Sequence, residues 1–569
     1  MKILLVLTSL LLSITFAMSQ STKPHDKEQI DDWDYNSTIP TFEMGNMQIK
    51  SMSAPTMMKR VASDSIGFSV GGAKDANNFY KNIDNNYLPK IDSITYEGVF
   101  YDHYFDTRSK QSCKNLFCPD YSTAIRKNIY TDKDEHFITV GLNSNIKKSD
   151  FKRKKLNIVV VLDISGSMGS AFNQYYYDKG KKINIEESQT SKMKIANETI
   201  VNMIDHLSLH DRLGVVLFDN RSYRAKPLSL IKTTNISAIK NHILEIKQRG
   251  GTNWSAGYKE GLRLFDNLSH DNSYENRIIF ITDAMPNRGE LAKEKLFGMI
   301  KEASSHKIYT SVIGVGVDFN NDLVEYISKT RGANYFSVHS AKEFKKRLNK
   351  EFDYLVTPLV FDLKLEIASS SYSIDSVYGA PKADTVTGTI FEVDTLFPSD
   401  SSDEGVKGGV ILVKLKKQGD SEDIKIKVSY KDRDNNPYKV EKTIKFKSGN
   451  YTDNSGIKKA IALTDYVSLM KNWLLDTRAG CNDSLNYPYP PIHILQQRSL
   501  IYPPNRPIYP NIKTWERKSC PLVVSDGYKK LFSIFKNNFD SSFTKEYKTV
   551  EKLLNKPSQN KKDDWNTNR

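Results

Sequence analysis

Short apolar runs alternate with helix-length amphipathic segments between residues 155 and 354. The apolar runs lie at 156–162, 213–219, 277–282 and 308–316. Runs of this kind, apolar on both faces, are typical of parallel strands covered by helices. The first helical segment, 192–207, carries an apolar stripe that includes Ile195, Ile200 and Met203. Further helices are expected at 236–248, 290–305, 322–329 and 341–355. The pattern predicts a doubly wound, mostly parallel α/β domain over 155–354.

Strand signals lie on both sides of this domain. Before it, 67–83 predicts a Gly-Gly turn and a short helix, and strand signals then dominate from 95 to 150. They include Thr95–Tyr101 and His136–Gly141. After it, strands are expected at 360–368, 408–417, 424–430 and 439–447. Their polar loops fit an antiparallel β-sandwich, which either flanks the α/β domain or receives it as an insertion.

Pattern and composition together divide the chain into six parts. They are a signal peptide (1–19), a linker or flexible arm (20–66), an N-terminal β-rich segment (67–154), the α/β domain (155–354), the β-sandwich (355–450) and a C-terminal region (451–569). The C-terminal region is expected to hold helices at 456–479 and 522–554, a proline-rich stretch at 488–510 and a polar tail.

The first nineteen residues have the features of an export signal. Lys2 gives a positive start, Ile3–Phe16 is almost wholly apolar, and the small residues Ala17 and Ser19 follow. The apolar run is shorter than the ~20 residues that span a bilayer, which favours cleavage over an uncleaved anchor. No later segment is apolar and long enough to be transmembrane. The sequence therefore predicts a secreted or periplasmic protein.

The expected export affects how the cysteines are interpreted. The chain has four of them: Cys113, Cys118, Cys481 and Cys520. An even number in an oxidising compartment suggests two disulfides, for which three pairings are possible. We expect the local pairing of Cys113 with Cys118 and of Cys481 with Cys520. The spacing lacks the CxxC pairs and nearby histidines of a zinc site, and no histidine stands out as the partner of a catalytic thiol.

The chain is basic, with a formal net charge of +15. Basic exported proteins can bind acidic glycans, envelope polymers or acidic proteins. The lysines are spread along the chain, however, which favours a role in solubility. No nucleic-acid-binding module is recognisable, so nucleic acid is not expected as a partner.

The candidate chemistry begins where the first strand of the α/β domain ends. Asp163, Ser165 and Ser167 follow that strand, and Gly166 allows a tight turn between the two serines. In open parallel sheets, ligands bind at the carboxyl edge, where the connections diverge to opposite faces. One carboxylate and two hydroxyls are hard ligands that suit Mg²⁺, Mn²⁺ or Ca²⁺.

Two later loops can complete this site. Thr252 follows Gly250 and Gly251, and Asp283 ends the strand at 277–282. The five residues resemble the metal-ion-dependent adhesion site of the von Willebrand factor A family, which reads DxSxS, then Thr, then Asp across three loops. All its elements are present here in order.

The resemblance implies a role for each residue. Ser165 and Ser167 would ligate the ion directly, Thr252 would join them when a ligand is bound, and Asp163 and Asp283 would act through bound water. The ion would keep one position open for a carboxylate of a partner protein. The alternative is that the ion only ties the three loops together.

Residues near these loops are candidates for the rim of the site. The long stretch after Ser167 contains Tyr175, Tyr176 and Tyr177, and tyrosines are frequent contact residues. They could equally cover the edge of the sheet. Asn253 and Trp254, beside Thr252, are further rim candidates.

The whole pattern resembles exported bacterial von Willebrand A proteins, similar in layout to the inter-α-trypsin-inhibitor heavy chains and to the calcium-activated chloride channel regulators. The HExxH zinc-protease motif of the latter is absent, and so is a P-loop. No catalytic arrangement is recognisable, so no enzymatic activity is expected. We expect an exported, metal-dependent adhesion or protein–protein interaction protein. The alternative is a structural component of the cell envelope whose metal is only structural.

Overall fold

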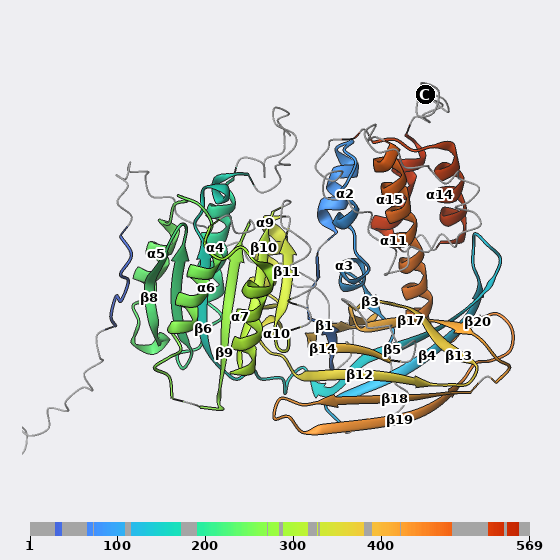
Figure 1. The fold of residues 1–569 in the computed structure, drawn as a ribbon, viewed down its shortest axis with the longest axis horizontal. Coiled ribbons are helices and arrows are strands. Elements are labelled where there is room, and N and C mark those ends of the chain that lie inside the picture. Colours follow the sequence, from blue (N-terminus) through green and yellow to red (C-terminus); the bar gives the residue numbers. More distant parts are fainter. Residues whose placement is uncertain are drawn as a thin grey trace, which may run out of the picture.

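The computed structural model describes residues 29–36, 65–107, 115–171, 190–283, 288–316, 330–380, 390–480 and 520–556, apart from a few short gaps, and also Ile327. Figure 1 shows three parts. An α/β domain lies at one side, a strongly curved antiparallel sheet at the other, and a group of helices lies over the curved sheet.

The α/β domain is built on a seven-stranded sheet in the order β2-β11-β10-β9-β6-β7-β8. Its strands are β2 (Ala73–Lys74), β6 (Lys155–Asp163), β7 (Arg212–Phe218), β8 (Ser222–Leu230), β9 (Tyr274–Thr282), β10 (Ile308–Val315) and β11 (Asn334–Val338). All neighbours are parallel except β8, which runs antiparallel to β7. The chain builds outward from β6 to one side and then crosses to β9 on the other, so the seam between β6 and β9 is the switch point.

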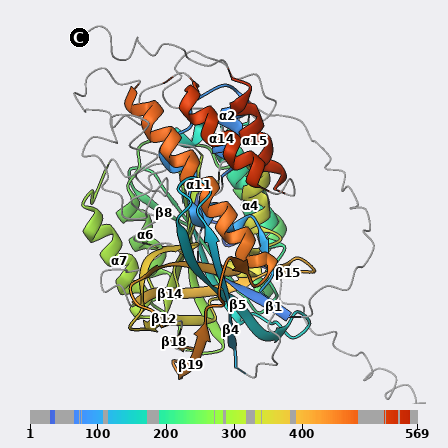
Figure 2. The same ribbon diagram turned by 90° about the vertical axis from the view of Figure 1, so that its right-hand side faces the viewer.

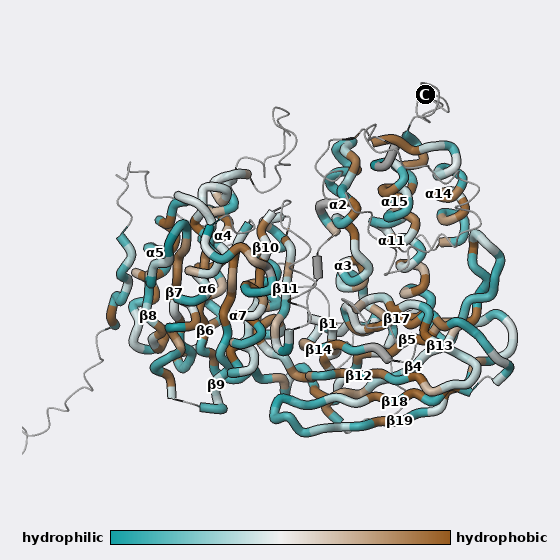
Figure 3. Tube along the Cα trace, in the orientation of Figure 1, coloured by the Kyte–Doolittle hydropathy of each residue, from teal (hydrophilic) through white to brown (hydrophobic). Residues whose placement is uncertain are grey.

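Helices cover both faces of this sheet. One face holds α4 (Lys192–Ile204), α5 (Ile236–Leu244), α9 (Ala341–Leu348) and α10 (Phe352–Leu355), and the other holds α6 (Trp254–Arg263) and α7 (Lys293–Ser305). Val160 and Leu162 of β6 pack in the first core, whereas Val159 and Val161 pack in the second. The apolar strands stand out in Figure 3. The predicted doubly wound domain is confirmed.

Individual helices differ from the sequence prediction. The segment 341–355 forms two helices instead of one, because the backbone leaves helical geometry at Asn349. Helix α6 was not predicted from the sequence. The expected helix at 322–329 lies outside the described residues except for Ile327.

The second sheet has ten strands, all antiparallel to their neighbours. They are β1 (Ser65–Val70), β4 (Phe117–Lys127), β5 (Asp134–Lys147), β12 (Val360–Ala368), β13 (Tyr372–Tyr378), β14 (Ile390–Ser399), β17 (Val410–Lys417), β18 (Asp423–Lys431), β19 (Pro437–Lys445) and β20 (Tyr451–Thr452). A small third sheet joins β3 (Tyr104–Phe105), β15 (Ser401–Ser402) and β16 (Gly405–Lys407).

In the ten-stranded sheet, strands from before the α/β domain lie between strands from after it. β1 pairs with β14, and β5 pairs with β17. The sheet also curls over its own core. Phe117 of β4 meets Tyr430 of β18 at 5.4 Å between ring centroids, although four strands separate β4 from β18 in the sheet. The α/β domain is therefore an insertion into one sandwich-like unit, as one of the two sequence hypotheses held.

A helical layer covers this sheet. It consists of α2 (Asn77–Asp84), η1 (Ile91–Ser93), α3 (Tyr96–Tyr101), α11 (Ser455–Gly480), α14 (Asp526–Asn538) and α15 (Thr544–Leu554), which share one core. Figure 2 shows α11 running from the sheet toward α14 and α15. No helix among the described residues is long and apolar enough to cross a membrane.

The predicted strand at Thr95–Tyr101 is wrong, because these residues form helix α3. The Thr95 side chain caps the helix by accepting from the Gly98 backbone N–H at 3.0 Å. Tyr96, Val99 and Phe100 are all buried, at a spacing that suits one helix face. Contacts with the helical layer therefore override the strand preference of these aromatic and β-branched residues.

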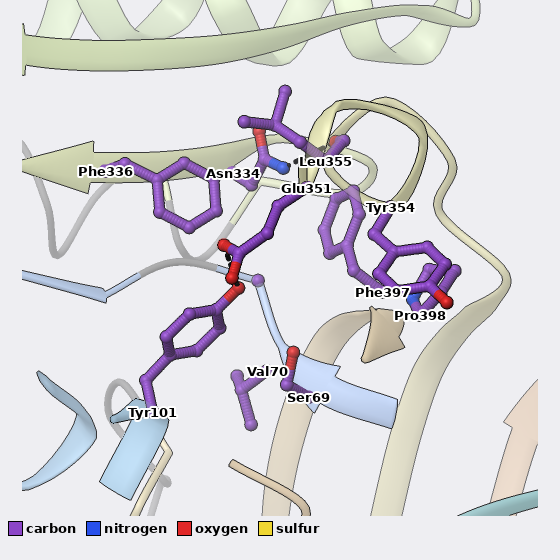
Figure 4. Close-up of a pocket in the computed structure, with 11 residues that line it drawn as sticks. Ser69, Val70, Tyr101, Asn334, Phe336, Glu351, Tyr354, Leu355, Phe397 and Pro398 are labelled. Carbon is purple, nitrogen blue, oxygen red and sulfur yellow. Dashed lines mark hydrogen bonds between the residues drawn. The ribbon is translucent and has the colours of Figure 1, made fainter. Parts of the chain in front are cut away.

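The junction between the two larger units is a buried ion cluster. Glu351, beside α10, accepts from Arg347 at 2.6 Å and from the Tyr101 hydroxyl at 3.3 Å, and it pairs with Lys407 of β16. Burial alone would raise the pKa of Glu351, but Arg347 and Lys407 lower it to about 2. Figure 4 shows Glu351 and Tyr101 facing each other in a small cavity between the units. Charge pairing thus fixes the insertion on the sandwich.

Several predicted features fall partly or wholly outside the described residues. Cys118 and Cys520 are described and neither is free, but Cys113 and Cys481 lie outside the described residues. The disulfide pairing stays a prediction, as does the signal peptide over 1–19. The proline-rich stretch at 488–510 also lies outside. In the expected linker, 29–36 contact the α/β domain and β1 already begins at Ser65.

Replacing Trp473 with alanine tests whether the C-terminal helices belong to the core. Trp473 is fully buried, lies 6.0 Å from the Phe532 ring, and donates from its indole N–H to the Val523 carbonyl at 3.0 Å. We expect Trp473→Ala to lower the free energy of unfolding by about 3–5 kcal/mol in urea titrations. Leu244→Ala, at a 46% exposed position on α5, should change it by about 0.5 kcal/mol or less. Equal effects of the two changes would contradict the shared core.

Candidate metal centre

The two predicted carboxylates lie side by side at the switch point of the seven-stranded sheet. Asp163 ends β6, and Asp283 directly follows β9. The two strands are paired in register, with Leu162 opposite Ile281. Both carboxylates are almost completely buried. Their position is the one that the sequence predicted.

The serine loop connects these carboxylates. The Ser165 backbone N–H donates to Asp163 Oδ1 at 2.7 Å, and the Ser165 and Ser167 hydroxyl oxygens are 3.0 Å apart. The Ser167 hydroxyl then donates to Asp283 Oδ1 at 2.7 Å. Four of the five predicted residues therefore form one continuous chain of contacts.

Backbone hydrogen bonds bring the Thr252 loop to the serine loop. The Gly166 N–H donates to the Gly250 carbonyl at 3.0 Å, and the Arg249 N–H donates to the Ile164 carbonyl. Gly250 has φ +71°, and a Cβ there would lie 3.1 Å from Asp219, so the position favours glycine. Thr252 is 2% exposed, and its carbonyl accepts from the Arg288 N–H at 3.2 Å. All three predicted loops thus meet at the site.

Thr282, which the sequence did not single out, and Trp254, which it placed at the rim, hold Asp163 in position. The Thr282 hydroxyl donates to Asp163 Oδ2 at 2.6 Å, and the Trp254 indole N–H donates to that hydroxyl oxygen at 3.2 Å. Both Asp163 oxygens therefore accept hydrogen bonds. The only sequence signal for Thr282 was its place just before Asp283.

A lysine also contacts the site. Lys192 is the first residue of α4, and its Nζ donates to Asp283 Oδ2 at 2.8 Å. Both side chains are at least 95% buried. A buried ion pair of this kind compensates one of the two carboxylate charges. In the sequence, Lys192 could be placed only as the start of an apolar-striped helix.

The electrostatics and donor types suit a hard dication. Burial, and then the nearby charge of Asp283, raise the pKa of Asp163 to about 7. With Lys192 paired to Asp283, the site still carries an uncompensated carboxylate when Asp163 is ionised. The side-chain donors are carboxylate and hydroxyl oxygens, which Mg²⁺, Mn²⁺ and Ca²⁺ prefer. No cluster of three or more His, Cys, Asp or Glu occurs in the described part of the chain, so a cation at this position would need hydroxyl oxygens as well as carboxylates.

The structure describes two of the five predicted rim residues, Asn253 and Trp254. Tyr175, Tyr176 and Tyr177 lie outside the described residues. The Asn253 side chain caps α6, accepting from the Ala256 N–H at 3.1 Å. Trp254 is 4% exposed and packs edge-on against Phe280, so it is a core residue and not a rim residue as predicted.

An arginine takes the rim position instead. Arg288 is exposed and, with Asn220, Gly250 and Gly251, lines an open depression of about 520 Å³ beside the Thr252 loop. The Gly251 N–H donates to Asn220 Oδ1 at 2.9 Å, which holds the floor of the depression. Arg288 makes no ion pair with another described residue. The rim therefore offers a positive charge to a partner.

Comparison with known proteins identifies the domain. Residues 158–286 match the family model described as von Willebrand factor type A domain. Inter-alpha-trypsin inhibitor heavy chain H2 of Mus musculus is 24% identical over 221 residues, which cover 38% of this chain and 21% of that protein. The heavy chain of Homo sapiens with the same name matches equally well. The chain thus spans about a fifth of the length of these relatives.

Among solved structures, a von Willebrand factor type A protein from Catenulispora acidiphila is similar. It has 14% sequence identity and a TM-score of 0.38, with 66% of this chain and 85% of that chain covered. The matched family segment, 158–286, begins in β6 and includes all three loops of the site. The chain therefore contains a von Willebrand factor type A domain.

Proposed function

We propose that this is an exported interaction protein that binds an acidic group of a partner through a divalent cation. Asp163, Ser165, Ser167, Thr252 and Asp283 would hold the cation, with Mg²⁺ the first choice and Mn²⁺ or Ca²⁺ the alternatives. The observation that carries the proposal is the chain of contacts from Asp163 through the two serines to Asp283, at the edge where open sheets bind ligands.

The residues support binding in preference to catalysis. Among described residues, the Ser165 and Ser167 hydroxyls contact each other and Asp283, and no histidine is placed to activate either one. The cation would supply an electrophilic centre with a position open for a carboxylate. The protein residues would hold and orient that cation. No catalytic role is proposed for them.

The rim supports an acidic partner. Arg288 projects a positive charge at the depression beside the Thr252 loop, where it can pair with a second acidic group of the same partner. Such pairing at an exposed rim would act mainly on the association rate and would weaken with salt. The net charge of +15 would also attract an acidic partner at long range.

Thr252→Ala tests the proposed function. The resemblance gives Thr252 a role when a ligand is bound, so the change should reduce partner capture from an envelope extract at least tenfold in excess Mg²⁺, an effect of about 1.4 kcal/mol. Thermal unfolding should change little. Thr131→Ala, in a sandwich loop remote from the α/β domain, is the matched control. Capture is measured by quantitative pull-down with Mg²⁺ or EDTA.

Capture of the same partner in EDTA would contradict the proposal. It would favour the alternative of an envelope component whose metal is only structural. Detection by light scattering of an oligomer that forms without metal would also favour this structural alternative.

A further inference from the structure

A short acidic and aromatic segment, Gln29–Asn36, lies along the outer side of the α/β domain. We call it the strap. Figure 1 shows it in blue beside β8 and α5. The Ile30 N–H donates to the Thr233 carbonyl at 2.9 Å, the Asn235 N–H donates to the Ile30 carbonyl at 2.8 Å, and the Asp34 N–H donates to the Ala225 carbonyl at 2.8 Å. Strand β8 is the edge strand of its sheet, so the strap partly covers that edge.

A buried lysine under the strap is matched to a carboxylate. Lys226 of β8 is fully buried, and its Nζ lies 3.0 Å from Asp32 Oδ2. The Ser229 hydroxyl donates to the same oxygen at 2.6 Å. The other described partners of Lys226 Nζ are neutral oxygens. Release of the strap would therefore take away the one carboxylate that pairs with Lys226 among the described residues, which is costly.

Aromatic contacts fix the rest of the strap. The Trp33 ring stacks on His242 of α5, with 5.4 Å between centroids and an interplanar angle of 8°. Asp31 Oδ2 lies 2.9 Å from Nε2 of the same histidine. Tyr35 meets Tyr223 of β8 edge-on at 5.5 Å. The side chains of Asp31, Asp32, Trp33 and Tyr35 thus all contact the α/β domain. Asp31 and Asp34 are exposed, and Asp34 contacts the domain through its backbone N–H.

The end of the strap reaches the metal-site loops. The Arg249 guanidinium lies over the Tyr35 ring at 5.5 Å, and its Nε is 3.1 Å from Asp219 Oδ2. The Arg249 backbone bonds the serine loop, and the Asp219 carbonyl accepts from the Asn253 N–H at 2.7 Å. Tyr35 therefore packs on the residue that joins the Thr252 loop to the serine loop.

We propose that the surface formed by β8, α5 and Arg249 is a peptide-binding site for an acidic and aromatic segment. In this chain the strap occupies the site, and the occupied site steadies the Thr252 loop through Arg249. The binding site itself is independent of the proposed function, whereas the effect on the loop rests on it. Residues 37–64 separate the strap from β1, so the strap is a distinct segment of the chain.

Two full-length variants and a labelled peptide of residues 29–36 test the site. Asp32→Ala removes the partner of Lys226, and we expect this chain to release its strap and bind the peptide. Asp34→Ala removes an exposed carboxylate that makes no ion pair with another described residue. This variant should keep its strap and bind the peptide at least tenfold more weakly, as should the wild type. Fluorescence anisotropy measures binding, and the peptide should raise the melting temperature of the Asp32→Ala chain alone.

The outcomes separate the parts of the inference. Failure of the peptide to bind the Asp32→Ala chain, or equal binding to both variants, would overturn the binding site. For the loop, Mg²⁺ should bind the Asp32→Ala chain at least threefold more weakly than the wild type, with recovery on adding peptide. Peptide binding without that recovery would overturn the coupling. Absence of Mg²⁺ binding in every chain, the wild type included, would instead count against the proposed function.

Discussion

Replacing Lys192 with methionine should make the stability of the α/β domain depend strongly on Mg²⁺. Lys192 Nζ is the buried positive charge that compensates Asp283 in this structure. Methionine keeps most of the apolar stem but removes the charge. In EDTA, breaking this buried pair should lower the free energy of unfolding by about 3–5 kcal/mol. In excess Mg²⁺ the loss should be much smaller, because the ion would supply the missing charge.

The same change should strengthen Mg²⁺ binding, by about tenfold or more, because the ion no longer competes with the ammonium for Asp283. Thermal unfolding and calorimetric titration measure the two effects. Lys194→Met is the matched control, since Lys194 lies on the same helix but is exposed. An equal loss of stability with and without Mg²⁺ would show that Lys192 acts through packing alone.

The contact between Lys192 and Asp283 could not be predicted from the sequence, whereas the five site residues could. The five site residues could be predicted because each is tied to a strand end or a tight loop, and the apolar runs locate those ends. The contact between Lys192 and Asp283 depends on how α4 docks on the sheet, which residue spacing does not encode. Thr282 was missed for a related reason, since its hydroxyl could equally have faced the core without contacting Asp163.

The position of the strap and the helical state of α3 could not be predicted from the sequence for a different reason. The strap has no periodicity and is too short to be stable alone, so its position depends on Lys226, His242 and Arg249 from distant parts of the chain. Helix α3 has strand-forming residues whose helical state depends on packing in the helical layer. The insertion of the α/β domain was foreseen as one possibility, but the interleaved pairing of β1 with β14 and β5 with β17 was not.

Asp163→Asn should separate the stability of the metal-free domain from its ability to bind metal. Burial and Asp283 raise the pKa of Asp163 to about 7 in the folded chain, above the ordinary aspartate value of 3.8. Between these two values the folded state binds more protons than the unfolded state. The stability of the metal-free wild type should therefore fall as the pH rises through this window and then level off above about pH 7.

Asparagine is neutral at every pH, so it removes this penalty. Its oxygen can still accept from the Ser165 N–H, and its amide can donate to the Thr282 hydroxyl oxygen after that hydroxyl reorients. In EDTA near pH 8, where the wild-type carboxylate is ionised, we expect Asp163→Asn to be more stable by about 1–3 kcal/mol. Near pH 5 the advantage should largely disappear. Urea titrations at the two pH values measure the difference, and Asp420→Asn, on an exposed sandwich loop, is the control.

Asp163→Asn should raise the stability of the metal-free domain but weaken its binding of Mg²⁺. The variant lacks a carboxylate in the proposed metal set, so calorimetry should detect no Mg²⁺ binding to it, and Mg²⁺ should not raise its melting temperature. In the wild type, binding requires loss of the Asp163 proton, so affinity should fall about tenfold for each pH unit below about 7. A variant that is less stable than the wild type in EDTA near pH 8 would show that its lost hydrogen bonds outweigh the charge. A variant that still binds Mg²⁺ with wild-type affinity would remove Asp163 from the site.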